Sequence, residues 1–222
     1  MTRFAPILKA ATKNAGGKAA LEKRLPKPNT VRKIKGVADD RYLSQMLLRV
    51  FSAGLSHKMV ANKWPEFEKM FFGFAPKRVR AMNDEALEAL MGDRRVIRHW
   101  GKIKSVRANA AAMCDVVDEA GSFGAWLADW PEEDIVGLWA EMTKRFTQMG
   151  GASTPRFLRM VGKDTFILTP DVVQALNGAG VAKGKLNGKR DRGLVQQAFN
   201  EWRVETGLPL CQMSLILAIS VG

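Results

Sequence analysis

Cysteine is scarce in this chain of 222 residues, which holds two, Cys114 and Cys211. Both lie in apolar runs of helical spacing and lack the spacing of a metal site. We therefore expect buried free thiols in a reducing cytosol and no disulfide framework. Long apolar runs are also missing: the closest candidate, residues 208–221, is too short for a membrane-spanning helix and contains Gln212 and Ser214. The sequence predicts a cytoplasmic protein with no membrane partner.

Acidic residues are too few to balance the basic ones. The chain has 35 Lys and Arg residues against 22 Asp and Glu, a net charge of +13 and a pI near 10.0. Such an excess suits a nucleic-acid partner, because neutralised phosphates release counterions and drive binding. Charge alone leaves open a basic solvated surface with no such partner. At this length, with 46% apolar residues, the chain can bury one substantial core or two small lobes.

The first 36 residues contain one acid, Glu22, against ten Lys and Arg residues. Pro26, Pro28 and the pair Gly16-Gly17 discourage a continuous helix. We expect residues 1–36 to form a flexible basic arm that adds non-specific affinity for DNA. A disordered leader without that role, similar in composition to an organelle transit peptide, is the alternative.

From residue 37 to 222 the sequence predicts one helix after another. Apolar residues recur at helical spacing behind capping residues, and no strand pair or internal repeat is recognisable. The fold class is therefore all-α. Glycines and basic residues between 178 and 193 predict a basic loop. The expected helices cover residues 39–52, 56 to a kink or end at 64–65, 84–91, 98–117, 132–148, a run opened by residues 153–155, 172–176, 194–206 and 210–220.

Residues 148–162 predict a helical hairpin. Gly150 and Gly151 follow an amphipathic run and allow positive φ and close backbone approach. Ser153 and Thr154, with Pro155, are typical of a helix start and open a second amphipathic run. Because the first N–H groups of a helix have no internal partner, this turn is a natural phosphate site.

Three blocks of sequence carry a family resemblance: residues 53–56 (Ala-Gly-Leu-Ser), residues 97–103 (Ile-Arg-His-Trp-Gly-Lys-Ile) and residues 157–162 (Phe-Leu-x-x-x-Gly). In this order they resemble bacterial DNA-3-methyladenine glycosylase I, of the helix-hairpin-helix glycosylase superfamily. The resemblance covers about residues 40–162. Residues 166–172 are similar to the loop after the hairpin in the general superfamily.

The resemblance implies a bilobed helical enzyme of base excision repair, which hydrolyses the N-glycosidic bond of alkylated purines such as 3-methyladenine. The damaged nucleotide would be flipped out of double-stranded DNA into the cleft between the lobes. Gly54 and Leu55 would form the loop pressed into the vacated stack, with an ordinary core leucine as the alternative for Leu55. The expected phosphate contacts are Lys102, Lys104, Gly150, Gly151, Ser153 and Thr154, and the expected base-pocket residues are Arg49, Phe51, His57 and Trp64.

Departures from the family pattern concern the chemistry. The glutamate that recognises the base is replaced by Arg49, which cannot accept a hydrogen bond. The superfamily's catalytic aspartate is replaced by Thr169; Asp171, two residues on, is a weak catalytic candidate whose simpler interpretation is a first-turn acid on the helix dipole. No lysine stands at the lyase position, so we expect a monofunctional enzyme. His57, His99, Cys114 and Cys211 are not placed like the family's zinc ligands, so we expect no metal and no cofactor.

Two classes of function remain open from the sequence. The first is a monofunctional glycosylase, expected to act as a monomer in a bacterial cytoplasm in association with the nucleoid. The second is a non-catalytic helix-hairpin-helix DNA-binding protein that lost its chemistry when the pocket acid became Arg49. Both need the same hairpin and the same basic face.

Overall fold

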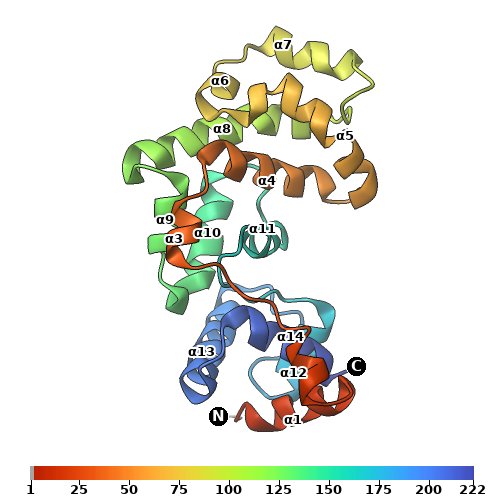
Figure 1. Cartoon of the computed structure of the whole chain (residues 1–222), viewed down its shortest axis with the longest axis vertical. Coiled ribbons are helices and arrows are strands. Elements are labelled where there is room, and N and C mark those ends of the chain that lie inside the picture. The colour runs from red at the N-terminus through yellow and green to blue at the C-terminus, as the bar shows by residue number, and fades with distance from the viewer. Residues whose placement is uncertain (1–2) are drawn as a thin grey trace. The chain divides into compact units, whose positions relative to one another are not determined.

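The computed structural model describes residues 3–222, and within that range it contains helices and no strands (Figure 1). The all-α prediction is confirmed. The chain divides into two compact units, and each unit is assembled from separate stretches of sequence. Unit 1 comprises residues 1–29, 131–138 and 162–222; unit 2 comprises residues 30–130 and 139–161. No helix in the described part of the chain combines the length and apolarity needed to cross a membrane.

Unit 2 is built around α4 (Asp39–Ser52), which contacts α5, α8, α9 and α11. Aspartates at the start of α4 and Arg49 at its end suit the helix dipole. The other helices of this unit are α3 (Val31–Lys35), α5 (His57–Met70), α6 (Pro76–Arg80), α7 (Asp84–Ala89), α8 (Trp100–Ala120), α9 (Phe123–Asp129), the later part of α10 (Ile135–Arg145), α11 (Ser153–Val161) and the 3₁₀ turns η1 (Phe72–Phe74) and η2 (Leu90–Gly92).

Unit 1 has its own aromatic core. The rings of Phe166 and Phe199 stack with centroids 4.3 Å apart, and Trp202 packs edge-on against Phe199. Asp164 is buried and accepts hydrogen bonds from the amides of Leu210 and Cys211, which caps the last helix. The helices are α1 (Ala5–Asn14), α2 (Lys18–Glu22), α12 (Pro170–Gly178), α13 (Lys189–Thr206), α14 (Leu210–Ser220), the start of α10 and the 3₁₀ turn η3 (Glu132–Asp134).

The N-terminal segment differs from the flexible arm expected for residues 1–36. Its described residues form α1, α2 and α3, and α1 lies against α14 (Figure 1). Phe4 is fully buried beside Trp202, with ring centroids 5.3 Å apart, and Ile34 is buried in unit 2. The physical reason is that these apolar side chains, spaced between the basic residues, anchor the segment while the lysines and arginines remain on the outside. The expected boundary at residue 37 is likewise replaced by a division at residues 29–30.

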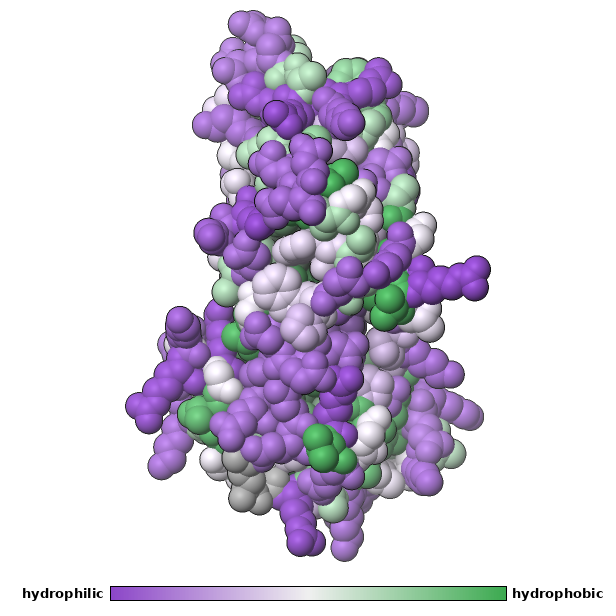
Figure 2. All heavy atoms as spheres, turned by 90° about the vertical axis from the view of Figure 1, so that its left-hand side faces the viewer, coloured by the Kyte–Doolittle hydropathy of each residue, from purple (hydrophilic) through white to green (hydrophobic). Residues whose placement is uncertain are grey.

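Two helix boundaries also differ from expectation. Pro65 lies inside α5, which continues to Met70 instead of ending at residues 64–65. The expected basic loop is shorter, because α13 begins at Lys189 and takes in Arg190 and Arg192. The surface agrees with the high charge: hydrophilic residues cover most of the face drawn in Figure 2, and apolar residues are scattered across it in small groups.

Candidate nucleic-acid interface

The turn between α10 and α11 is the best-defined candidate site. Gln148 and Gly151 adopt positive φ values of 63° and 59°. Gly150, Gly151 and Ala152 are exposed. Within residues 3–222, the amide nitrogens of these three residues and of Thr154 donate to no acceptor. Several unsatisfied N–H groups at the start of a helix form a site for an anionic oxygen.

Ser153 and Thr154 hold the turn rather than extend toward a ligand. Thr154 is fully buried, and its Oγ1 donates to the carbonyl of Met149 at 2.5 Å. Ser153 is buried and its amide donates to Gly150 O at 3.1 Å. α11 begins at Ser153, so Pro155 is its third residue instead of its first, a position that also needs no internal N–H bond. The structure corrects the expected phosphate contact of Thr154, because the residue is enclosed.

Asn109 of α8 anchors this hairpin and was missed by the sequence reasoning. Its Nδ2 donates to Thr147 O at 3.1 Å, and its Oδ1 accepts from Thr147 N at 2.7 Å. Asn109 is fully buried, so its side-chain amide requires partners, and the backbone of Thr147 supplies both. The available signal was an asparagine next to the apolar positions of a long helix, where a polar side chain requires a partner.

The second sequence block, at the start of α8, lies beside the same turn. His99 caps α8 by accepting from the amide of Lys102 at 3.3 Å, which confirms its expected structural role. A Cβ on Gly101 would lie 3.7 Å from the Gln148 side chain. Lys104 is exposed, with its Nζ 5.3 Å from the centre of the Trp100 ring. Lys104 is therefore free to meet a phosphate.

Lys102 occupies a different place from the one expected. It is 6% exposed, and its Nζ donates to the carbonyls of Phe51 at 3.1 Å and Ala53 at 2.7 Å. These carbonyls lie at the C-terminal end of α4, where a cation satisfies both the orphan acceptors and the helix dipole. Burial, followed by the charge of Arg49, lowers the pKa of Lys102. The structure corrects the phosphate assignment: Lys102 fixes the end of α4.

The loop that follows α4 contains Gly54 and Leu55, the two residues expected to enter the DNA stack. Gly54 is exposed with φ 75° and has open space around it. Leu55 is half-buried, and its amide reaches Ser52 O at 3.4 Å. Ser56 caps α5 and His57, the first residue of that helix, is exposed. Leu55 is therefore not a fully buried core residue, and the carbonyl of Ala53, two residues earlier, accepts a hydrogen bond from Lys102 Nζ.

Phe51 and Trp64 belong to the core of unit 2 instead of an open pocket. Phe51 is fully buried, with its ring centroid 4.7 Å from that of Phe67. Trp64 stacks between Phe67 and Phe74, and its indole nitrogen donates to Ser44 Oγ at 3.0 Å. The expectation that either ring stacks on a flipped base is corrected, because both rings pack among the aromatic side chains of unit 2.

Arg49 is the one expected pocket residue with an unsatisfied polar group. It is 6% exposed, and its Nε is enclosed without a hydrogen-bond partner. Burial, and then the nearby Arg156 of α11, lower the pKa of its guanidinium. Arg156 itself is exposed, on the first turns of α11, and is a second residue that the sequence reasoning missed.

Thr169 and Asp171 lie in unit 1, at the start of α12. Thr169 caps the helix, since its Oγ1 accepts from the amide of Val172 at 3.3 Å. Asp171 is an exposed residue in the first turn. This placement favours the helix-dipole interpretation of Asp171 over a catalytic one. No cluster of three or more His, Cys, Asp or Glu side chains in residues 3–222 is arranged to hold a metal ion.

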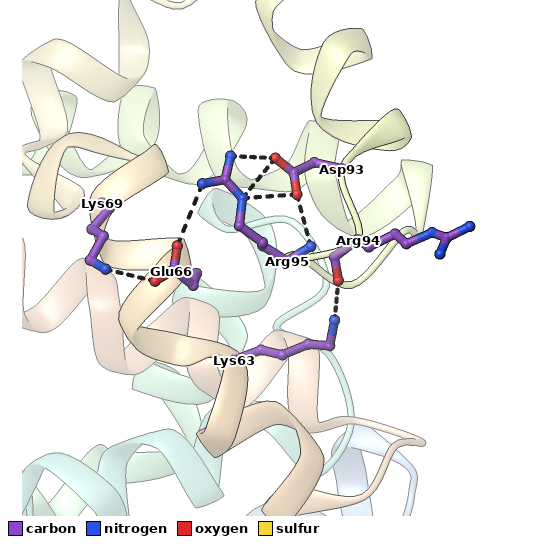
Figure 3. A network of polar contacts seen from close by, with 6 residues as sticks. All are labelled: Lys63, Glu66, Lys69, Asp93, Arg94 and Arg95. Carbon is purple, nitrogen blue, oxygen red and sulfur yellow. Dashed lines mark hydrogen bonds and ion pairs between the residues drawn. The ribbon is translucent and has the colours of Figure 1, made fainter.

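An ion-pair network supports the loop that leads into α8 (Figure 3). Arg95 pairs with Asp93 at 2.7 Å and with Glu66 of α5 at 3.7 Å. Lys63 of α5 donates to the carbonyl of Arg94, whose own side chain points away from the network in Figure 3. The guanidinium and the backbone amide of Arg95 both donate hydrogen bonds to Asp93, and they keep the pKa of that carboxyl below its usual value. The network holds an exposed arginine, Arg94, in place without neutralising it.

An all-helical chain with a helical hairpin whose turn amides are free defines a helix-hairpin-helix protein. A family model described as methyladenine glycosylase matches residues 34–155, more than half of the chain. The chain belongs to the methyladenine glycosylase family, which confirms the resemblance seen in the sequence.

One curated relative and several solved structures are similar to this chain. DNA-3-methyladenine glycosylase 1 of Escherichia coli (strain K12) is 39% identical over 75 residues, which are 33% of this chain and 40% of that protein. The 3-methyladenine DNA glycosylase I of Staphylococcus aureus is 18% identical, with 69% of this chain and 92% of that chain covered and a TM-score of 0.52. The 8-oxoguanine DNA glycosylase of Methanocaldococcus jannaschii is 12% identical, with 95% and 91% covered and a TM-score of 0.57. Both structural likenesses concern the fold alone.

Proposed function

We propose that this protein is a monofunctional DNA glycosylase of base excision repair. It removes alkylated purines such as 3-methyladenine from double-stranded DNA by hydrolysing the N-glycosidic bond after base flipping. Membership of the methyladenine glycosylase family supports the reaction. The observation that carries the DNA-binding half of the proposal is the set of free, exposed amides at Gly150, Gly151 and Ala152.

In this proposal the backbone of the turn binds a phosphate, and exposed cations bind its neighbours. The amides donate to phosphate oxygens. Arg156 and Lys104 add an electrostatic attraction that weakens as the salt concentration rises. Leu55, on the loop after α4, enters the stack where the damaged base has left. The backbone contacts carry no sequence information, as a repair enzyme that acts at any sequence requires.

The chemical step needs little catalytic assistance from the protein. A purine methylated at N3 is a cationic leaving group, so water can displace it with limited acid–base help. Asp171 remains the weak candidate for that help. Unit 2 alone carries the turn, the wedge and the exposed cations, which supports action as a monomer. With DNA as its substrate, the protein would act at the nucleoid in the bacterial cytoplasm.

One set of observations favours the second candidate, a non-catalytic DNA-binding protein. Arg49 has no carboxylate partner in the described part of the chain, and the Thr169 hydroxyl caps α12. Such a protein would keep the turn and lose base release.

Base release separates the two candidates. Methylated duplex DNA is incubated with the protein, and free bases are scored by chromatography against DNA without protein. The glycosylase proposal expects 3-methylpurine release well above the spontaneous rate. Binding without any release would establish the non-catalytic candidate.

A further inference from the structure

Arg49 is a buried cation without a counter-charge. Its side chain projects from α4, a helix surrounded by α5, α8, α9 and α11, and the residue keeps 6% exposure. Its Nε has no acceptor, and no ion pair to Arg49 exists among residues 3–222. An enclosed guanidinium nitrogen that lacks an acceptor is costly, because its lost hydration is not replaced.

The charges closest to Arg49 are also positive. Arg156 and Lys102 both interact with it unfavourably. Lys102 donates to the carbonyls of Phe51 and Ala53, and its ammonium group offers no acceptor to Arg49. The site therefore has surplus donors and positive charge, and it lacks acceptors.

An acceptor supplied by a ligand would satisfy such a site. The guanidinium fork fits two acceptors on one edge, and the guanine edge presents them as O6 and N7. Adenine presents N7 beside a donating amino group, which would oppose a donor of the protein. A backbone phosphate is a poorer fit, since the exposed Arg156 and the free amides of residues 150–152 already offer phosphate a more accessible place.

We propose that Arg49 reads the flipped base, and that the protein prefers damaged purines with an oxygen at C6 over those with an amino group at C6. This inference rests on the proposed glycosylase function and narrows its substrate class. It makes Arg49 a specificity-determining residue of this chain.

Two methylated bases provide a matched test. 3-Methylguanine and 3-methyladenine share the N3 methyl group and a labile cationic bond, and differ in the edge that Arg49 would contact. Single-turnover rate constants for both, each divided by the spontaneous rate, give one selectivity ratio. We expect a ratio of about tenfold or more in favour of 3-methylguanine, in line with one bidentate base contact. Arg49→Met should reduce the ratio to near one, and Arg49→Glu should invert it.

Arg80→Met is the matched control, since Arg80 is an exposed arginine of the same unit and should leave the ratio unchanged. A parent that favours 3-methyladenine, or a ratio that Arg49→Met does not change, overturns the proposal. If Arg49→Met instead weakens duplex binding and lowers its salt dependence at a constant ratio, Arg49 binds phosphate and the proposal is also overturned.

A binding measurement separates this inference from the glycosylase proposal. Calorimetry compares the affinity of parent and Arg49→Met protein for the free bases 3-methylguanine and 3-methyladenine. If no base is released from DNA and yet the parent binds 3-methylguanine about tenfold more tightly in an Arg49-dependent way, the chemistry fails and the base-reading role stands. If neither release nor selective binding occurs, both fail.

Discussion

Asn109 and Thr147 exchange two hydrogen bonds, one from Asn109 Nδ2 to Thr147 O at 3.1 Å and one from Thr147 N to Asn109 Oδ1 at 2.7 Å. The pair ties the middle of α8 to the residues just before the hairpin turn. The start of α8 reaches the same turn through Gly101 and Gln148. A buried side-chain amide thus determines where the free backbone amides lie.

Asn109→Leu should weaken DNA binding and reduce stability together. The variant keeps the side-chain volume but removes both hydrogen bonds to the amide and carbonyl of Thr147, at a cost of about 1–3 kcal/mol for two part-buried bonds. Denaturant unfolding measures the stability and fluorescence anisotropy the affinity for duplex DNA. Asn14→Leu also removes a side-chain bond, to Ile219 O in unit 1, and should leave DNA affinity unchanged. Equal loss of affinity in both variants would contradict the anchoring role.

Gly151→Val should reduce DNA affinity more than its effect on stability can explain. Gly151 has φ 59° and open space around it, so the added side chain strains the backbone and covers the amides. Gly207→Val is the control: Gly207 has φ 69°, is equally open and lies after α13. Both variants should lose about 1–3 kcal/mol of stability. Equal DNA affinities would remove the turn from the interface.

Arg156→Ala and Lys104→Ala should each lower the salt dependence of duplex binding. Each variant gives up one phosphate contact, so the slope of log affinity against log salt should fall by about one. Lys102→Met should lower stability instead, because it uncaps the carbonyls of Phe51 and Ala53. If affinity for DNA hardly depends on salt in the parent, the phosphate assignments are wrong.

Arg49→Met should stabilise the protein. The change removes an enclosed charge without partners and keeps most of the apolar stem, and we expect a gain of about 1–3 kcal/mol in the free energy of unfolding. Arg80→Met, on the exposed surface, should change it by no more than about 0.5 kcal/mol. A clear loss of stability in Arg49→Met would show that the guanidinium is satisfied in the folded protein.

We expect the protein to lose stability in alkali because of Tyr42, the only tyrosine of the sequence. Its hydroxyl donates to Ile34 O at 2.7 Å, and burial raises its pKa to about 12. The unfolded chain loses this proton near pH 10, while the folded protein keeps it, so stability falls as the pH rises from about 10 to about 12. Tyrosinate absorbance of the native protein should titrate late. In Tyr42→Phe this part of the alkaline slope should disappear, whereas an unchanged slope would contradict the assignment.

The sequence predicted what depends on local chemistry. Helix starts at Ser56, Asn83 and Thr169 follow from side-chain oxygens that accept the first amides, and the glycine turn follows from positive φ. Burial of a charged side chain depends on partners far along the chain and was not predictable in this way. Lys102 was expected to bind phosphate, whereas it binds the end of α4. That contact lies about fifty positions earlier in the chain and leaves no local pattern in the sequence.

The N-terminal segment illustrates the same limit. Its basic composition predicted an exposed arm, whereas Phe4 is buried beside Trp202, and its amide donates to Glu205 in α13. Both partners lie about two hundred residues away. A few well-placed apolar residues decide such docking, and average composition conceals them.

The most direct test of the account counts three products in one incubation of methylated duplex DNA with the protein: free methylpurine, abasic sites and strand breaks. A monofunctional glycosylase predicts one abasic site for each base released and intact strands until alkali is added. Gly151→Val should lower the first two counts together. Duplex that is bound with high affinity but yields no free base above the spontaneous level would contradict the account.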